Sequence, residues 1–179
     1  MRIISGICRG RKLNTLEGDN TRPTADRVKE SVFNILGTSV MDKNVLDLFA
    51  GSGALGLEAL SRGAASCVFV DSSKAAMKII ERNIAGCRFE EKAKTYLSEF
   101  KSAISRFSKG QFDLVFLDPP YHKNFGIEAL SLLSEAVSED GVVILETDGD
   151  EEVLDCVGAF EKYDVRGYGR TKVSFFRKK

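Results

Sequence analysis

Short apolar runs alternate with amphipathic segments over most of the chain, from Asn44 to about residue 160. The short runs are rich in Val, Leu and Phe and predict strands that are buried on both faces. Between them, apolar residues recur three and four positions apart, which predicts helices. This alternation is typical of a parallel sheet that is covered by helices on both faces. The predicted strands span residues 44–49, 67–71, 87–90, 113–118 and 141–146, and the predicted helices span 54–62, 73–85, 96–107, 125–137 and 150–158.

The N-terminal part departs from this alternation. Residues 1–13 pair two short apolar stretches across a turn rich in glycine, which predicts a small hairpin. A helix is then predicted to begin with Thr24 as its N-cap and to end at Gly37. The two elements expose basic side chains, namely Arg9, Arg11, Lys12, Arg22, Arg27 and Lys29.

The C-terminal part also differs from the centre. Residues 161–176 predict two strands joined by a turn that contains glycine, and therefore an antiparallel hairpin at the edge of the sheet. We expect an α/β fold with a seven-stranded, mostly parallel sheet that ends in this hairpin. A basic extension over residues 1–37 precedes the main domain over residues 38–179, and the two form one compact unit.

Charge and composition narrow the class of protein. The net charge is zero, but residues 1–30 carry seven basic and four acidic residues and residues 161–179 carry seven and two. Basic ends on an acidic centre are compatible with binding of a polyanion, although a solvated surface explains them equally well. No apolar run reaches the length of a membrane span and no signal sequence is recognisable, so we expect a cytoplasmic protein. The four cysteines lack C-x-x-C spacing and the chain has one histidine, so we expect neither disulfides nor a metal site.

A glycine-rich turn follows the first predicted strand. Gly51, Gly53 and Gly56 satisfy G-x-G-x-x-G, which on its own is compatible with a dinucleotide-binding dehydrogenase. Asp47, beside this turn, would repel a pyrophosphate but would attract an ammonium group. S-adenosylmethionine carries an ammonium and no phosphate, so Asp47 favours it as the cofactor.

The next strand ends in Asp71, which can accept both hydroxyls of a ribose. The alternative is an N-cap for the following helix, a role that Ser72 or Ser73 could fill. The adenine is expected near the end of the third strand, where Thr95 could contact it. The predicted cofactor site therefore comprises Asp47, Phe49, Gly51, Ser52, Gly53, Asp71, Ser72 and Thr95.

The buried strand at 113–118 ends in Asp118-Pro119-Pro120-Tyr121. An exocyclic amine on a base is a poor nucleophile, and acceptors for its N–H groups orient its lone pair toward a methyl donor. Asp118 supplies a carboxylate and Pro119 a carbonyl for this purpose, while Tyr121 offers a ring on which a flipped base can stack. The alternative is a rigid X-Pro-Pro turn with a core tyrosine. Guanine, with two adjacent donors, suits a carboxylate better than adenine does, although adenine could also be served.

Four segments together resemble the RsmD-type methyltransferases, which modify the exocyclic N2 of a guanine in 16S (small-subunit) ribosomal RNA. The segments are Gly6 to Leu13, Arg22-Pro-Thr through Leu36, Leu46 through Gly63, and Asp118 to Tyr121. The resemblance implies a Rossmann-like class I fold, S-adenosylmethionine as donor with S-adenosylhomocysteine as product, and a ribosomal particle as partner. It implies that Asp118, Pro119 and Tyr121 are catalytic and that RNA is bound by Arg9, Arg11, Lys12, Arg22, Thr24, Arg27 and Pro120. The region Lys92 to Tyr96 lacks the acid often found near the adenine in this group.

Three other functions remain open from the sequence. An adenine-N6 methyltransferase acting on RNA or DNA is the main alternative, although the chain has no room for a DNA target-recognition domain. A dehydrogenase and an RNA-binding protein without catalytic activity are the others. We expect a monomer.

Overall fold

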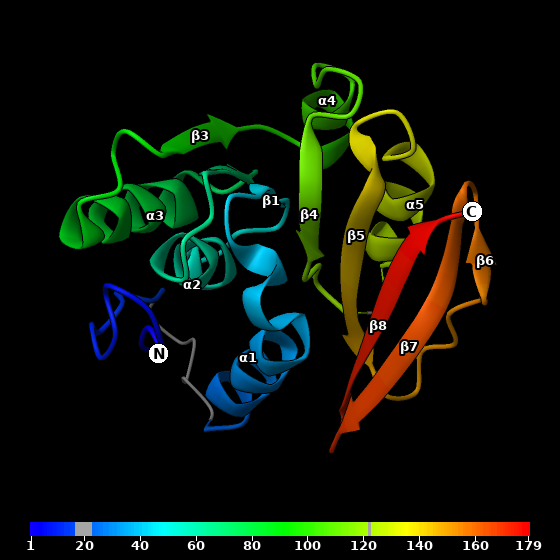
Figure 1. The fold of residues 1–179 in the computed structure, drawn as a ribbon, viewed down its shortest axis with the longest axis horizontal. Coiled ribbons are helices and arrows are strands. Elements are labelled where there is room, and N and C mark those ends of the chain that lie inside the picture. The colour runs from blue at the N-terminus through cyan, green and yellow to red at the C-terminus, as the bar shows by residue number, and fades with distance from the viewer. Residues whose placement is uncertain (17–22, 122) are drawn as a thin grey trace.

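The computed structural model describes residues 1–16, 23–121 and 123–179, without the side chains of residues 23–25. One mixed sheet of eight strands runs through the described chain in the order β3-β2-β1-β4-β5-β8-β7-β6 (Figure 1). The strands are β1 (Asn44–Asp47), β2 (Ser66–Asp71), β3 (Ala93–Leu97), β4 (Phe112–Leu117), β5 (Val137–Asp148), β6 (Cys156–Val157), β7 (Phe160–Tyr168) and β8 (Thr171–Lys178). β1 to β5 pair in parallel, whereas the pairs β5–β8, β8–β7 and β7–β6 are antiparallel.

Helices cover both faces of this sheet, as the sequence predicted. They are α1 (Pro23–Leu36), α2 (Ala54–Ser61), α3 (Lys74–Cys87), α4 (Phe100–Ile104) and α5 (Phe125–Leu132), with a 3₁₀ turn, η1 (Gly37–Val40), after α1. Successive residues of one strand point to opposite faces of the sheet and pack in different hydrophobic cores. Phe116 packs with the residues of α1, α2 and α3, and Leu117 packs with those of α4 and α5. Strands such as β4 therefore need apolar residues at nearly every position.

The order of the sheet reverses between β1 and β4. β1 pairs with β2 on one side and with β4 on the other. The connection after β1 therefore leads to one side of the sheet, and the connection after β4 leads to the other. The carboxyl ends of strands at such a switch point form a crevice in which open α/β proteins bind ligands.

The third strand was predicted at residues 87–90, but it lies at Ala93–Leu97. Cys87 and Phe89 are buried, but they belong to the end of α3 and the turn that follows it, not to a strand. Arg88 between them has a left-handed conformation (φ 60°). β3 is an edge strand without a fully buried residue, so its sequence carries no apolar run. Because β3 extends to Leu97, the helix predicted at 96–107 is confined to α4.

Two other helices were overpredicted. The helix expected at 125–137 ends at Leu132, and Val137 already belongs to β5. The helix expected at 150–158 is wrong, because this segment runs through a loop into β6. Val153 and Val157 are both buried, and their four-residue spacing imitates a helical face. β6 also makes the sheet eight-stranded rather than seven-stranded, while the predicted antiparallel edge is confirmed.

The predicted N-terminal hairpin is confirmed by an antiparallel bridge between Arg2 and Lys12. At its turn Gly6 has a φ of 84°, and a Cβ there would lie 1.8 Å from the carbonyl oxygen of Ser61. Only glycine fits this close approach to α2. Figure 1 shows this hairpin, in blue, beside α2 and α1.

The predicted limits of the first helix are partly wrong. α1 ends before Gly37, as expected, but it begins at Pro23, so Thr24 lies inside the first turn and is not the N-cap. Proline is favoured at the first position of a helix, because an N–H group there would have no hydrogen-bond partner within the helix.

Candidate active site

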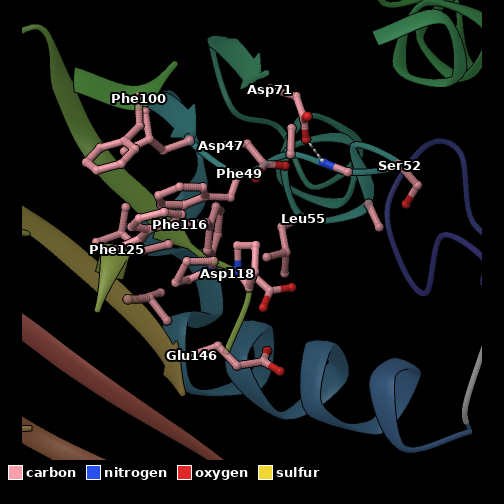
Figure 2. A pocket seen from close by; sticks show the side chains of 18 of the residues that line it. Asp47, Phe49, Ser52, Leu55, Asp71, Phe100, Phe116, Asp118, Phe125 and Glu146 are labelled. Carbon is pink, nitrogen blue, oxygen red and sulfur yellow. Dashed lines mark hydrogen bonds between the residues drawn. The ribbon is translucent and has the colours of Figure 1, made fainter. Parts of the chain in front are cut away.

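A cavity of about 590 Å³ opens at the carboxyl ends of β1, β2, β4 and β5. Figure 2 shows Asp71 and Asp47 at one end of it, Glu146 at the other end and Asp118 between them. α1 closes one side with Val28, Lys29 and Val32. The crevice expected from the sheet order thus contains the three acidic residues that the sequence singled out, and two more, Glu99 and Glu146.

A left-handed glycine, one hydrogen bond and one close packing contact shape the glycine-rich turn. Gly53 adopts a φ of 78° as the N-cap of α2. The N–H of Gly56 donates to Oδ2 of Asp47 at 3.0 Å, and a Cβ on Gly56 would lie 2.4 Å from the Phe69 ring. The third glycine of the motif therefore allows α2 to pack closely on β2 and fixes the Asp47 carboxylate.

The Asp47 carboxyl is only 1% exposed, yet it lines the cavity. Burial, with a smaller contribution from the charge of Asp71, raises its pKa to about 7, and the Gly56 hydrogen bond acts against this. An ammonium group in the cavity would stabilise the charged carboxylate, whereas a phosphate would repel it. The electrostatics therefore favour a cationic ligand at this end.

Asp71 ties the end of β2 to the glycine-rich turn. Its Oδ2 accepts from the N–H of Gly51 at 2.9 Å and its Oδ1 accepts from the N–H of Ser73 at 2.8 Å. Ser73, not Asp71, is the N-cap of α3, because its hydroxyl accepts from the N–H of Ala76. Asp71 therefore has the position expected for a ribose contact, and the capping role falls to one of the two serines named as candidates.

The cavity wall beyond β3 differs from the expectation. Thr95 lies in β3 and is not among the lining residues; Ser98, Glu99 and Phe100 line the cavity instead. Phe100 packs against Phe49 with ring centroids 5.3 Å apart. Glu99 is the N-cap residue of α4, but its side chain makes no capping hydrogen bond. It is an exposed acid near the expected adenine position, three residues beyond the region where the sequence showed none.

The Asp118–Tyr121 turn forms the middle of the cavity wall, and all four of its residues line it. Tyr121 is 40% exposed, so the alternative of a core tyrosine does not hold. Its hydroxyl donates to Oε1 of Glu146 at 3.0 Å. Burial, followed by the charge of Glu146, raises the pKa of Tyr121 far above its usual range, so the hydroxyl remains a donor.

Glu146 was missed by the sequence analysis. It lies near the end of β5, in a run that was assigned to a buried strand, and it lines the cavity. A carboxylate after Ile144-Leu145 was a signal of the same kind as Asp118 after Phe116-Leu117. The missing information was the pairing of β5 with β4, which places the two acids side by side.

The predicted RNA-binding residues fall into three groups, of which the basic side chains that the structure describes do not line the cavity. Arg9, Arg11 and Lys12 are exposed on the hairpin and Arg27 is exposed on α1, whereas Arg22 and the side chain of Thr24 lie outside the described residues. Pro120 is exposed at the cavity itself.

A buried carboxylate holds the hairpin beside the cavity. Glu58 of α2 accepts from the backbone N–H groups of Ile4 and Ser5, at 2.7 and 3.0 Å. Lys29 was expected to be exposed, but this prediction is wrong, because the side chain is buried. It donates to the Arg2 carbonyl and lies 3.6 Å from Glu58. Met1 then reaches the cavity wall. The basic hairpin is therefore fixed at the edge of the site.

Comparison with known proteins gives the family. Residues 1–177 match the protein family described as "Conserved hypothetical protein 95". The "Ribosomal RNA small subunit methyltransferase D" of Haemophilus influenzae is 37% identical over 86% of this chain and 82% of its own. The chain belongs to this RsmD family.

Two further similar proteins extend the match to the whole chain. The "Putative rRNA methyltransferase YlbH" of Bacillus subtilis is 38% identical over the full length of both chains. The solved structure of "Putative methyltransferase yhhF" from Escherichia coli superposes with a TM-score of 0.89 at 29% identity, covering 100% of this chain and 98% of that one. These similarities confirm three predictions: the methyltransferase fold, the enzyme class and S-adenosylmethionine as the methyl donor.

Two findings concern the remaining expectations. Within residues 1–16, 23–121 and 123–179, no helix is long and apolar enough to cross a membrane. In the same residues, no group of His, Cys, Asp and Glu side chains is arranged to hold a metal ion.

Proposed function

We propose that this protein transfers a methyl group from S-adenosylmethionine to the exocyclic N2 of a guanine in 16S (small-subunit) ribosomal RNA. The observation that carries the proposal is that one cavity contains both the glycine-rich turn with Asp47 and Asp71 and the Asp118–Tyr121 turn. The substrate printed in the name of the Haemophilus influenzae relative supports the choice of RNA. The exposed arginines at the edge of the cavity are suited to its phosphates.

The cofactor fits one end of the cavity. The Asp47 carboxylate, fixed by Gly56, would receive the ammonium, and Asp71 would receive the ribose hydroxyls. Glu99 offers an acceptor for the amino group of adenine, and the rings of Phe49 and Phe100 offer an apolar wall. These residues replace Thr95 in the proposed adenine contact. When bound, the sulfonium supplies an activated methyl group.

The other end of the cavity would orient the acceptor base. Asp118 and the carbonyl of Pro119 would accept the two N–H groups of the amine, which directs the nitrogen lone pair toward the methyl carbon. The ring of Tyr121 would stack on the base. Transfer of the methyl group from sulfur to the amine would leave a surplus proton on the amine, which Asp118 would accept and pass to solvent.

The extension over residues 1–37 would hold RNA next to the domain over residues 38–179. Arg9, Arg11, Lys12 and Arg27 would contact phosphates, which positions the RNA without selecting its sequence. We propose a monomer that acts in the cytoplasm on an assembled or assembling ribosomal particle.

Nucleoside analysis tests the proposal. Purified protein and tritiated S-adenosylmethionine are incubated with small-subunit particles from cells that lack the gene. The RNA is then digested, and the labelled nucleosides are separated by chromatography and identified by mass spectrometry. We expect N2-methylguanosine. Labelled N6-methyladenosine would instead support the adenine alternative, and no labelled nucleoside in RNA or particles would reject both. Calorimetry that showed binding of NAD and not of S-adenosylmethionine would support a dehydrogenase.

A further inference from the structure

Asp118 and Glu146 occupy matching register positions at the carboxyl ends of neighbouring strands. The parallel register of β4 and β5 pairs Leu117 with Leu145. Asp118 directly follows the end of β4, and Glu146 is the next residue of β5. Neighbouring strands lie about 4.8 Å apart, and side chains one position beyond a matched pair point to the same face. Figure 2 shows the two carboxylates beside each other, on the side of the cavity that faces α1.

The two acids have different surroundings. Asp118 is exposed, whereas Glu146 is largely screened from solvent and accepts the hydrogen bond of Tyr121 at Oε1. Burial raises the pKa of Glu146, and the Tyr121 hydrogen bond acts against this. A carboxylate has about four acceptor positions, so one donor from Tyr121 leaves Glu146 able to accept another. A desolvated acceptor that is held in place by a neighbour gains more from a matching donor than an exposed one does.

We propose that Glu146 selects the target base by accepting the N1–H of guanine while Asp118 and Pro119 hold the N2 amine. This inference rests on the proposed function. In guanine, N1–H and N2 are adjacent donors on one edge, and two adjacent carboxylates match them. In adenine, the ring nitrogen next to the amine carries a lone pair, which would face the Glu146 carboxylate and be repelled. Glu146 is thus a specificity residue, distinct from the Asp118–Tyr121 turn.

A base analogue isolates this contact. 2-Aminopurine keeps the exocyclic N2 amine of guanine, but its N1 is an acceptor. The modified guanine is first mapped, and small-subunit RNA with 2-aminopurine at that position is assembled into particles. For the unmodified enzyme we expect kcat/KM to be about ten- to a hundredfold lower on the analogue, the range of one good base contact. For Glu146→Gln, whose amide can donate to N1 of the analogue, we expect this ratio to shrink by about tenfold.

Two variants serve as controls. Tyr121→Phe removes the donor to Glu146 but keeps the ring, so kcat falls while the preference for guanine persists. Glu161→Gln changes a surface carboxylate that pairs with Arg177 on the distant hairpin, and should leave rate and preference unchanged. If Glu146→Gln lowers the rate on both bases equally, as Tyr121→Phe does, Glu146 only holds the tyrosine and the inference is overturned.

The outcomes also separate this inference from the function on which it rests. If the unmodified enzyme forms no N2-methylguanosine, the proposed function fails. If it forms N2-methylguanosine but uses 2-aminopurine equally well, only the role of Glu146 fails. Binding of S-adenosylmethionine by Glu146→Gln, measured by calorimetry, should equal that of the unmodified protein and shows that the variant is folded.

Discussion

The two ends of the cavity hold their acids in different ways. At the proposed cofactor end, Asp47 and Asp71 accept hydrogen bonds from the backbone N–H groups of Gly56, Gly51 and Ser73. At the proposed base end, Glu146 accepts a hydrogen bond from the side chain of Tyr121, and Asp118 is exposed. Backbone N–H groups therefore fix the acids at the proposed cofactor end, while a side chain holds Glu146 at the other end.

This difference predicts two classes of variant. Changes at the proposed base end should affect turnover more than cofactor binding, because these side chains lie away from the glycine-rich turn. Changes at the cofactor end should affect folding and cofactor affinity together. The following predictions test the division, from the largest expected effect to the smallest.

Replacing Asp118 by Ala should have the largest effect. The variant loses an acceptor that orients the amine, and removal of one such oriented polar group typically lowers kcat by about 10²- to 10³-fold. Affinity for S-adenosylmethionine, measured by calorimetry, should change less than about twofold. Asp155→Ala, which changes an acid that is 89% exposed, is the matched control. Normal turnover by Asp118→Ala would remove this residue from the proposed mechanism.

Replacing Gly56 by Ala should act on the fold. The new Cβ would lie 2.4 Å from Phe69 and 2.6 Å from the sulfur of Cys67, both buried in β2. Overpacking of this kind lowers the free energy of unfolding by about 1–3 kcal/mol, which thermal unfolding would measure as a lower Tm. The variant should also bind S-adenosylmethionine more weakly, because the Asp47 contact moves with Gly56. Gly167→Ala, where a Cβ meets nothing within 4 Å, should leave Tm nearly unchanged.

The sequence predicted the cofactor end better than the base end, for the same structural reason. β1 and β2 are buried on both faces, so their apolar runs mark the strand ends, and the glycines of the turn are required by the backbone. The acids that follow these strands were therefore recognisable. The β3 edge strand has no such run, so the sequence named Thr95, whereas Ser98, Glu99 and Phe100 line the cavity.

Contacts between distant segments account for what the sequence missed. Glu146 acquires its position only through the pairing of β5 with β4, and Glu58 meets Ile4 across 54 residues. No local periodicity encodes either contact. The helix predicted at residues 150–158 is the opposite error. Val153 and Val157 are both buried at a helical spacing, although the backbone of this segment is not helical.

The pKa of Asp47 gives a pH dependence that belongs to the cofactor end. Its folded value of about 7 lies above the ordinary value of 3.8, so the protonated carboxyl is favoured by folding. The resulting stabilisation is complete below about pH 4 and is lost as the pH rises through about 7. A cationic ligand requires the charged form, so affinity for S-adenosylmethionine should fall roughly eightfold when the pH is lowered from about 7.5 to about 6.

Calorimetry at several pH values measures this effect. The release of bound protons can be followed by repeating the titration in buffers of different ionisation enthalpy. Asp47→Asn should bind more weakly at pH 7.5 and should lose most of the pH dependence, whereas Asp118→Ala should retain it. Equal pH dependence in Asp47→Asn and the unmodified protein would assign the titration to another group.

The smallest effect is expected from the exposed arginines of the hairpin, which lie beyond both ends of the cavity. Arg9→Ala combined with Arg11→Ala removes two phosphate contacts, so RNA affinity at moderate salt should fall several-fold and the slope of its salt dependence should decrease by roughly 1.5. Affinity for S-adenosylmethionine should not change, since the Glu58 contacts that fix the hairpin are backbone N–H groups. Lys92→Ala with Lys109→Ala is the matched control, because these lysines precede β3 and β4 at the opposite edge of the parallel strands. An equal loss of RNA affinity in the two double variants would mean that the whole surface, and not the hairpin, attracts RNA.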